Sequence, residues 1–236
     1  MATPGASSVL AVERPASGVV ALWLNRPESR NALDPALVEA LMDAFSAEDA
    51  RAFVLGSTDP GVFCAGADLK LADADRARLS DRLYELYRAM LLTAAPIVVA
   101  IAGPAVGGGA QLALAADLRV GGPAASIRFA GPGHGLAVGA WGLPSLVGRG
   151  RAVDLCLTMR GVSAQDALRI GLLDRVEADP AAAALGLAGA MAALDAEAAA
   201  RVKAIVREGT GLLDALDAER AGNRPWTGST AGLARA

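Results

Sequence analysis

The chain has 236 residues, of which 53% are hydrophobic and 20% are charged, and its formal net charge is −3. This length and composition allow a sizeable core in one or two domains, and the acidic balance argues against nucleic acid as a partner. Two cysteines are too few for a disulfide framework or a metal cluster. The first residues show no basic segment followed by an apolar run, so we expect a cytoplasmic protein without a signal peptide.

Strands are predicted where apolar residues alternate with polar ones or form short β-branched runs. Three such segments precede residue 60: 8–14, 19–24 and 52–57. Asp34 followed by Pro35 predicts the first turn of a helix between the second and third strands. A long amphipathic helix is predicted over 75–92. The first third of the chain therefore alternates strands with helices.

The segment from Pro96 to Asp117 is central to the prediction. A β-branched run at 97–101 is followed by Gly103-Pro104 and then by three glycines at 107–109, which open an apolar helix. A helix N-terminus carries unpaired N–H groups and partial positive charge. Such a site can bind an anion or stabilise a developing oxyanion. Glycines between a strand and a helix also serve packing alone, so the segment by itself is a weak signal.

A long uncharged stretch, from Ala89 to Ala116, contains the same segment and is long enough to suggest a membrane span. Its prolines and clustered glycines divide it into short elements, so we expect a buried strand, loop and helix and no membrane span.

The second half of the chain is predicted to become helical. Two short strands are expected at 118–120 and 127–129. Ser163 and Gly171 then bracket a helix as its N-cap and C-cap, and the alanine-rich segment 181–205 is expected to be helical with interruptions at its glycines. Strands alternating with helices, followed by a helical part, predict an α/β fold with a C-terminal helical subdomain.

A second loop of small residues, FCAGADLK, follows the predicted strand that ends near residue 57. With this loop, the chain resembles the enoyl-CoA hydratase/isomerase, or crotonase, family. The matching segments, in the order of the family, are LNRPESRNAL (24–33), FCAGADLK (63–70), GPAVGGGAQLALAADLRV (103–120), LVGRGRAVDLCLT (146–158) and SAQDALRIGLLDRV (163–176).

The resemblance implies a crotonase-type spiral of ββα turns. Its core, residues 1–175, would bind acyl-CoA, and the helical part, residues 176–236, would mediate trimerisation into a homotrimer or a dimer of trimers. The C-terminal part lacks the charged tail that is usual in the family, so the trimer is an expectation from resemblance alone. The ligand would be an acyl-CoA or enoyl-CoA thioester, and because CoA is part of that ligand, no separate cofactor or metal is expected.

The resemblance also assigns the reacting centre. In the family, two backbone N–H groups hold the thioester carbonyl oxygen, and the matching residues are Ala67 and Gly108. Hydratases of the family carry two catalytic glutamates, and the matching positions are Gln111 and Gly133. An amide cannot titrate and glycine has no side chain, so ordinary two-glutamate hydration is not supported.

The CoA moiety would lie along the first two matching segments. Arg26 and Arg30 are candidates for phosphate or ribose contacts, because guanidinium groups suit phosphate; the alternative is a solvated turn. The remaining candidates for contacts with CoA are Ser29, Ala65, Asp68 and Leu69. For Asp68 the alternative is the N-cap of a helix.

Three functions remain open. The first is an acyl-CoA-binding protein with little or no hydratase activity, similar to a mycobacterial subgroup of the family that lacks the catalytic glutamates and binds acyl-CoA. The second is an active enoyl-CoA hydratase, isomerase or other acyl-CoA lyase that uses water held by Gln111, or His134, the only histidine. His134 suits proton transfer if it faces the pocket, but neighbours in an extended segment point to opposite sides. The third is a non-catalytic structural or regulatory subunit.

The loop after His134 is shorter than is usual in the family. Trp141 in this loop either fills space that a substrate chain would otherwise occupy or lines the acyl pocket.

Overall fold

The computed structural model describes residues 9–46 and 49–230. Its main sheet has six strands in the order β1-β2-β3-β4-β6-β9. The first two strands form an antiparallel hairpin, and every other neighbouring pair is parallel. The strands are β1 (Leu10–Ala16), β2 (Val19–Leu24), β3 (Ala52–Ser57), β4 (Ile97–Ile101), β6 (Leu118–Gly121) and β9 (Arg175–Val176).

A second sheet of three short strands has the order β5-β7-β8. Strand β5 (Pro104–Val106) pairs in parallel with β7 (Ser126–Arg128), which pairs antiparallel with β8 (Val162–Ser163). Strand β5 leads directly into α3 (Gly108–Ala115), so this small sheet fixes where the glycine-rich helix begins.

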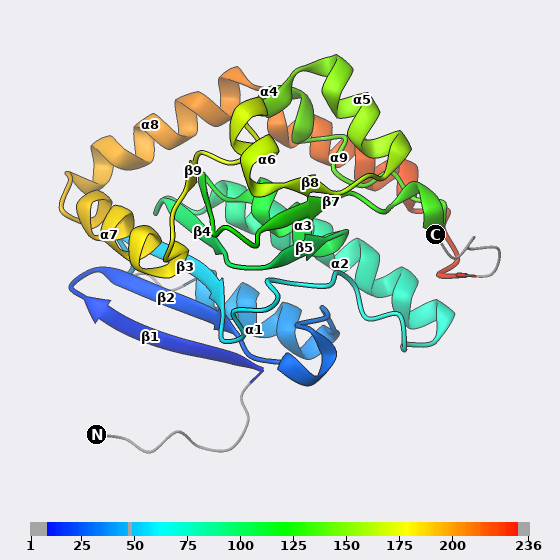
Figure 1. The fold of residues 1–236 in the computed structure, drawn as a ribbon, viewed down its shortest axis with the longest axis horizontal. Helices are drawn as coiled ribbons and strands as arrows, with labels where there is room; N and C mark the ends of the chain where they lie inside the picture. Colours follow the sequence, from blue (N-terminus) through cyan, green and yellow to red (C-terminus); the bar gives the residue numbers. More distant parts are fainter. Residues whose placement is uncertain (1–8, 47–48, 231–236) are drawn as a thin grey trace.

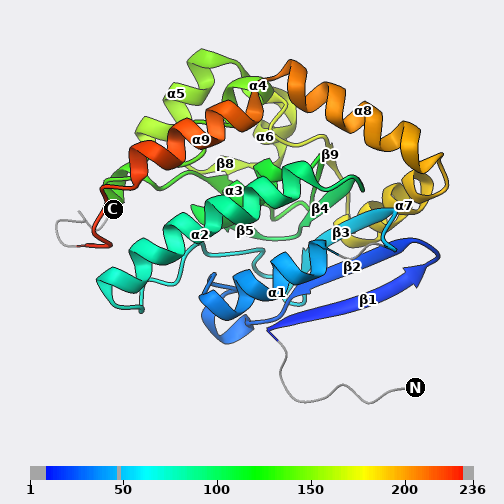
Figure 2. The same cartoon turned by 180° about the vertical axis from the view of Figure 1, so that it is seen from behind.

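Helices cover both faces of the main sheet, as Figures 1 and 2 show from opposite sides. Because successive residues of a strand point to opposite faces, Val19 of β2 packs with the cluster beneath α7 (Pro180–Ala192), whereas Val20 joins the larger cluster on the other face. That larger cluster includes α1 (Pro35–Phe45) and α2 (Asp73–Leu92). Small side chains on α7 let it lie close to the sheet.

Among the remaining helices, α6 contacts β7, β8 and β9, and α8 contacts α9. Helix α8 runs along the upper edge in Figure 1, and α9 packs against α2. Their bounds are α4 (Leu143–Val147), α5 (Arg149–Thr158), α6 (Ala164–Ile170), α8 (Ala196–Gly209) and α9 (Leu212–Asn223), with short 3-10 helices at Pro27–Ser29 (η1) and Pro132–His134 (η2).

Most predicted elements are present. The predicted strand at 52–57 and the caps at Asp34, Ser163 and Gly171 are confirmed. The first strand is shifted to Leu10–Ala16, and residue 8 lies outside the described residues. The long helix begins two residues earlier than predicted, at Asp73.

The predicted interruption of the alanine-rich segment at its glycines is wrong. Gly186 and Gly189 lie inside α7, and the break comes at residues 193–195, where Asp195 caps α8 by accepting a hydrogen bond from the Ala198 N–H at 2.8 Å. A glycine costs only about 1 kcal/mol in a helix interior, and packing of the α7 alanines on the sheet offsets that cost.

The uncharged stretch forms the last turn of α2, then β4 and α3 as predicted, and the expected loop between them contains the short strand β5. Across the described ranges, no single helix is long and apolar enough to cross a membrane. Taken together, α7 and α8 have the length and apolar composition of a membrane span, but they are bent by 113° at their junction. The predicted domain boundary after residue 175 falls inside β9, and the roles assigned to the two parts stay a prediction.

Candidate functional site

The loop of residues 64–68 meets the segment that leads from β5 into α3. Cys64 forms a parallel bridge with Ala105, and the Val106 N–H donates to the Cys64 carbonyl at 2.9 Å. Gly66 has φ +95, and a Cβ added to it would lie 2.8 Å from the Val106 carbonyl oxygen. Only glycine therefore lets the loop of residues 64–68 approach β5 and the start of α3 so closely.

These two segments bring the N–H groups of Ala67 and Gly108 together. A Cβ added to Gly108 would lie 3.5 Å from the Ala67 nitrogen. Gly108 is the first residue of α3, so its N–H has no partner within the helix. Within residues 9–46 and 49–230, neither N–H donates a hydrogen bond. Two neighbouring unpaired donors can hold one oxygen atom.

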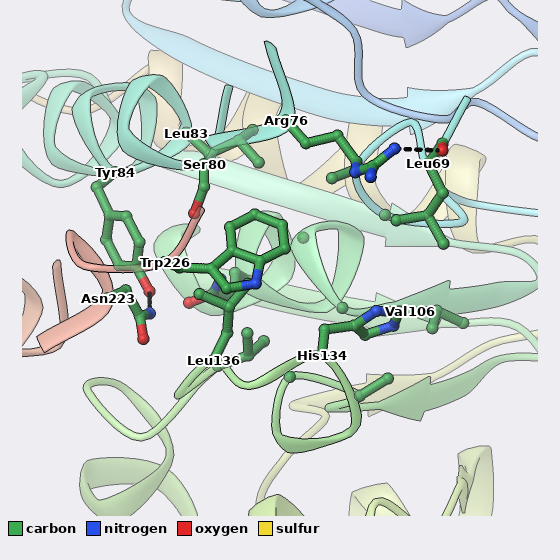
Figure 3. Close-up of a pocket in the computed structure, with 18 of the residues that line it drawn as sticks. Leu69, Arg76, Ser80, Leu83, Tyr84, Val106, His134, Leu136, Asn223 and Trp226 are labelled. Atoms are coloured by element: carbon green, nitrogen blue, oxygen red, sulfur yellow. Dashed lines mark hydrogen bonds between the residues drawn. The ribbon is translucent and has the colours of Figure 1, made fainter. Parts of the chain in front are cut away.

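These N–H groups border a cavity of about 110 Å³. Figure 3 shows its wall, to which α2 contributes Tyr84, and the segment at and after the end of α9 contributes Asn223 and Trp226. Six residues with predicted roles line the cavity: Ala65, Ala67, Leu69, Gly108, Gln111 and His134. The surface is largely apolar, with a few polar groups.

Gln111 is 4% exposed, and its side-chain oxygen is occupied. This oxygen accepts hydrogen bonds from the Trp141 indole N–H at 2.8 Å and from the Gly139 N–H at 3.2 Å. The Trp141 ring stacks on Tyr87, with ring centroids 6.5 Å apart, and does not line the cavity. Trp141 therefore fills space behind Gln111 and fixes the orientation of its amide.

A buried carboxylate, Glu219 on α9, accepts hydrogen bonds from the same two residues, Gly139 and Trp141, that donate to Gln111. It accepts hydrogen bonds from the Tyr84 hydroxyl at 2.7 Å, the Trp141 N–H at 3.0 Å and the Gly139 N–H at 3.2 Å. Burial raises the pKa of Glu219 to about 7, although these hydrogen bonds act in the opposite direction. Glu219 is therefore poised to gain or lose a proton near neutral pH.

His134 faces the cavity, which decides one of the open alternatives (Figure 3). His134 is the last residue of the 3-10 helix η2. The residue before it, Gly133, is exposed and lies outside the cavity wall. Burial, and then the charge of Arg76, lower the pKa of His134, and its ring is therefore neutral at pH 7. Its Nδ1 atom is buried without a hydrogen-bond partner among the described residues.

The two arginines proposed to contact CoA differ in their surroundings. Arg26 is engaged inside the protein, because its guanidinium lies 3.1 Å from an Asp34 oxygen and 3.6 Å from an Asp68 oxygen. Arg30 is exposed, and its carbonyl accepts a hydrogen bond from the Ala65 N–H at 3.0 Å.

Asp68 is not the N-cap of a helix. Its carboxylate closes a turn by accepting from the Lys70 N–H at 3.0 Å, five residues before α2 begins. The Ser29 hydroxyl donates to the Arg26 carbonyl at 3.1 Å. Arg26, Ser29, Arg30 and Asp68 lie outside the cavity wall.

Sequence reasoning missed Tyr84, Glu219, Asn223 and Trp226. A signal for two of them exists in α9, where Leu212, Leu216, Glu219 and Asn223 recur at helical spacing and so share one face. Leu216 is fully buried, and a helix that buries it must also bury its neighbours on that face.

The two sheets, the helices that cover them and the paired N–H groups define a protein of the crotonase-fold class. A sequence profile for enoyl-CoA hydratase/isomerase matches residues 14–230, and the chain belongs to this family. A probable enoyl-CoA hydratase of Mycobacterium leprae is 44% identical over 174 residues, which cover 69% of either chain. The crystal structure of an enoyl-CoA hydratase from Bacillus anthracis is 27% identical and has a TM-score of 0.81, covering 91% of this chain and 90% of its own.

Proposed function

We propose that the chain binds an acyl-CoA or enoyl-CoA thioester in this cavity and does not hydrate it by the two-glutamate route. The observation that supports binding is the pair of unpaired N–H groups at Ala67 and Gly108, which is suited to a thioester carbonyl oxygen. The apolar wall is suited to the acyl chain. Arg30, rather than the engaged Arg26, is the candidate for a phosphate of CoA.

The lack of two-glutamate hydration is supported by the side chains that occupy the corresponding positions. Gln111 cannot titrate, and its oxygen already accepts two hydrogen bonds. Gly133 has no side chain and lies outside the cavity wall. Water held by the Gln111 oxygen is therefore disfavoured.

A second candidate function is an enzyme that moves protons with His134, for hydration, isomerisation or thioester cleavage. The observation that favours it is the neutral ring in the cavity wall with an unpaired Nδ1. Replacing His134 by alanine would abolish such an activity and leave binding intact.

Native mass spectrometry, with the protein in excess over a panel of saturated and 2-enoyl-CoA thioesters, tests the first proposal. We expect a retained thioester without the added mass of water. Gly66→Ala should weaken binding, because its Cβ would collide with the Val106 carbonyl and displace Ala67. Gly186→Ala is the control, since that exposed glycine has nothing within 4 Å.

Hydration of a 2-enoyl-CoA far above the background rate would overturn the proposal. Retention of no thioester at all would support a structural or regulatory subunit instead.

A further inference from the structure

Tyr84 connects the cavity to a buried carboxylate that the proposed binding function does not use. Its hydroxyl donates to Glu219 at 2.7 Å and lies 2.7 Å from the Asn223 amide nitrogen, which donates to it. The same amide nitrogen also donates to the Ala137 carbonyl, while the Asn223 oxygen accepts from the Ala137 N–H at 2.9 Å. The phenol is therefore held in one orientation at the cavity wall (Figure 3).

Glu219 differs from an ordinary structural carboxylate. It is 7% exposed, and within the part of the chain that the structure describes no lysine, arginine or histidine forms an ion pair with it. Its neighbour Arg220 pairs with Asp81 and Glu85 instead. Both of its carboxylate oxygens accept hydrogen bonds, one from the Tyr84 hydroxyl and the Gly139 N–H and the other from the Trp141 backbone N–H. A buried charge without a cation is costly, so this carboxyl group gains a proton more readily than an exposed one.

We propose that Tyr84 and Glu219 form a proton-transfer pair that acts on the α-carbon of the bound acyl thioester, an inference that rests on the proposed acyl-CoA binding. The C–H bond at the α-carbon breaks, and its proton passes to the Tyr84 oxygen as the phenol proton passes to the Glu219 carboxylate. The electron pair of the C–H bond forms an enolate, whose oxygen is held by the N–H groups of Ala67 and Gly108. The reverse transfers return a proton to carbon, so no co-reactant is consumed.

The outcome of these transfers depends on the acyl chain. With a saturated chain, the proton returns to the α-carbon and the only change is exchange with solvent. With a double bond between the β- and γ-carbons, return to the γ-carbon shifts the double bond into conjugation with the thioester. The substrate class is thus an acyl-CoA with an acidic α-hydrogen, and a β,γ-unsaturated one would be isomerised.

Protons have a route from solvent to this pair. Tyr84 and Asn223 also line a second cavity, between α2 and the end of α9, together with Asp81, Arg220 and Arg224. The proton that passes from carbon to the Tyr84 hydroxyl can therefore exchange with water at this second cavity.

The groups around Glu219 leave it as the one that titrates near neutral pH. Burial raises the pKa values of Tyr84 and Tyr87 on α2 and of Cys156 on α5, so these three stay protonated. Burial lowers the pKa of His134, which stays neutral. Because Glu219 must be ionised to accept the phenol proton, exchange should rise with pH as Glu219 loses its proton.

The test is exchange of the α-hydrogens of butanoyl-CoA in D₂O, followed by proton NMR at several pH values, with binding measured in parallel by native mass spectrometry. Tyr84→Phe keeps the ring and removes the hydroxyl, and Glu219→Gln keeps the shape of the side chain. We expect each to slow exchange about a hundredfold or more and to abolish its rise with pH, while butanoyl-CoA still binds. The control is Asp217→Asn, on the same helix, whose exposed carboxylate pairs with Arg88; it should exchange like the unchanged protein.

Each contrary result has its own meaning. Binding without exchange by the unchanged protein overturns the proton-transfer pair and leaves the proposed function standing, whereas failure to bind overturns both. Exchange that survives in Tyr84→Phe but disappears in His134→Ala assigns the proton transfer to His134 and overturns the pair.

Discussion

Glu219 is a carboxyl group that water scarcely reaches, so its contribution to stability depends on pH. Burial raises its folded-state pKa from an ordinary 4.5 to about 7. Between these values the folded protein binds a proton that the unfolded chain does not. The contribution of Glu219 to stability is therefore fully present below about pH 4.5 and is lost as pH rises through about 7.

Glu219→Gln should remove this dependence. In the unchanged protein, the raised pKa of Glu219 lowers the free energy of unfolding by at most about 1.4 kcal/mol per pH unit between its unfolded and folded pKa values. Urea unfolding of both proteins at a series of pH values measures the difference between them. A difference that stays constant from pH 4.5 to 7 would show that Glu219 keeps the same charge throughout. Asp217→Asn, exposed on the same helix, should reproduce the unchanged curve.

At the scale of the element, two side chains of α8 bind it to the body of the protein: Arg207 donates to the Leu91 carbonyl at 3.1 Å, and Lys203 makes several contacts. The Lys203 ammonium lies 2.9 Å from an Asp117 oxygen, and it donates to the carbonyls of Met90 at 3.2 Å and Ala95 at 3.1 Å. These groups come from the ends of α2 and α3 and the segment that follows α2. The Lys203 side chain is 7% exposed, so its hydrogen bonds are shielded from water.

Lys203→Met keeps the hydrocarbon chain and removes the donor. We expect the free energy of unfolding to fall by about 2 kcal/mol, because two buried carbonyls lose a donor. The Asp117 carboxylate also loses its ion pair, although it keeps the hydrogen bond from the Ile97 N–H at 2.7 Å. Denaturant titration measures this loss. Arg201→Met is the matched control, since its pair with Glu197 is exposed and contributes less than about 1 kcal/mol. Equal losses in the two variants would refute the anchoring role.

Elements whose signals are local were predictable from the sequence. The caps at Asp34, Ser163 and Gly171 depend on neighbours a few residues away, and each is where its pattern indicates. Strand β5 is three residues long and forms by pairing with β7, so no periodicity in the sequence predicts it. The small-residue loops of the site were visible in the sequence, and the resemblance assigned Ala67 and Gly108 within them. Tyr84 and Glu219, in contrast, are 135 residues apart, and only the packing of α9 on α2 brings them together.

At the scale of the whole molecule, α8 leaves large apolar side chains in contact with water. Val202, Ile205 and Val206 are 62%, 68% and 62% exposed. Two of them, Val202 and Val206, line a largely apolar groove that continues to Leu114 and Leu118. We propose that this surface is buried between copies of the chain, in the homotrimer or dimer of trimers that the resemblance implies.

Val206→Asp should therefore shift the protein towards monomer, because assembly would bury an unpaired charge. Light scattering coupled to size-exclusion chromatography gives the mass of each species. Val12→Asp, an exposed valine on the edge strand β1 that is 54% exposed, should leave the mass unchanged. A monomeric unchanged protein, or an assembly that tolerates aspartate at position 206, would contradict this assignment of the surface.

Glu219 and Asn223 are synthesised after most of the residues that surround the cavity. A ribosome makes the N-terminal part of a chain first, so Tyr84, Gln111 and Trp141 have left it well before α9 exists. Until α9 docks, the N–H groups of residues 139 and 141 lack the carboxylate that accepts from them, and one side of the cavity is open. The nascent protein can thus assemble its sheets early, but the wall of the cavity closes only when α9 has been translated.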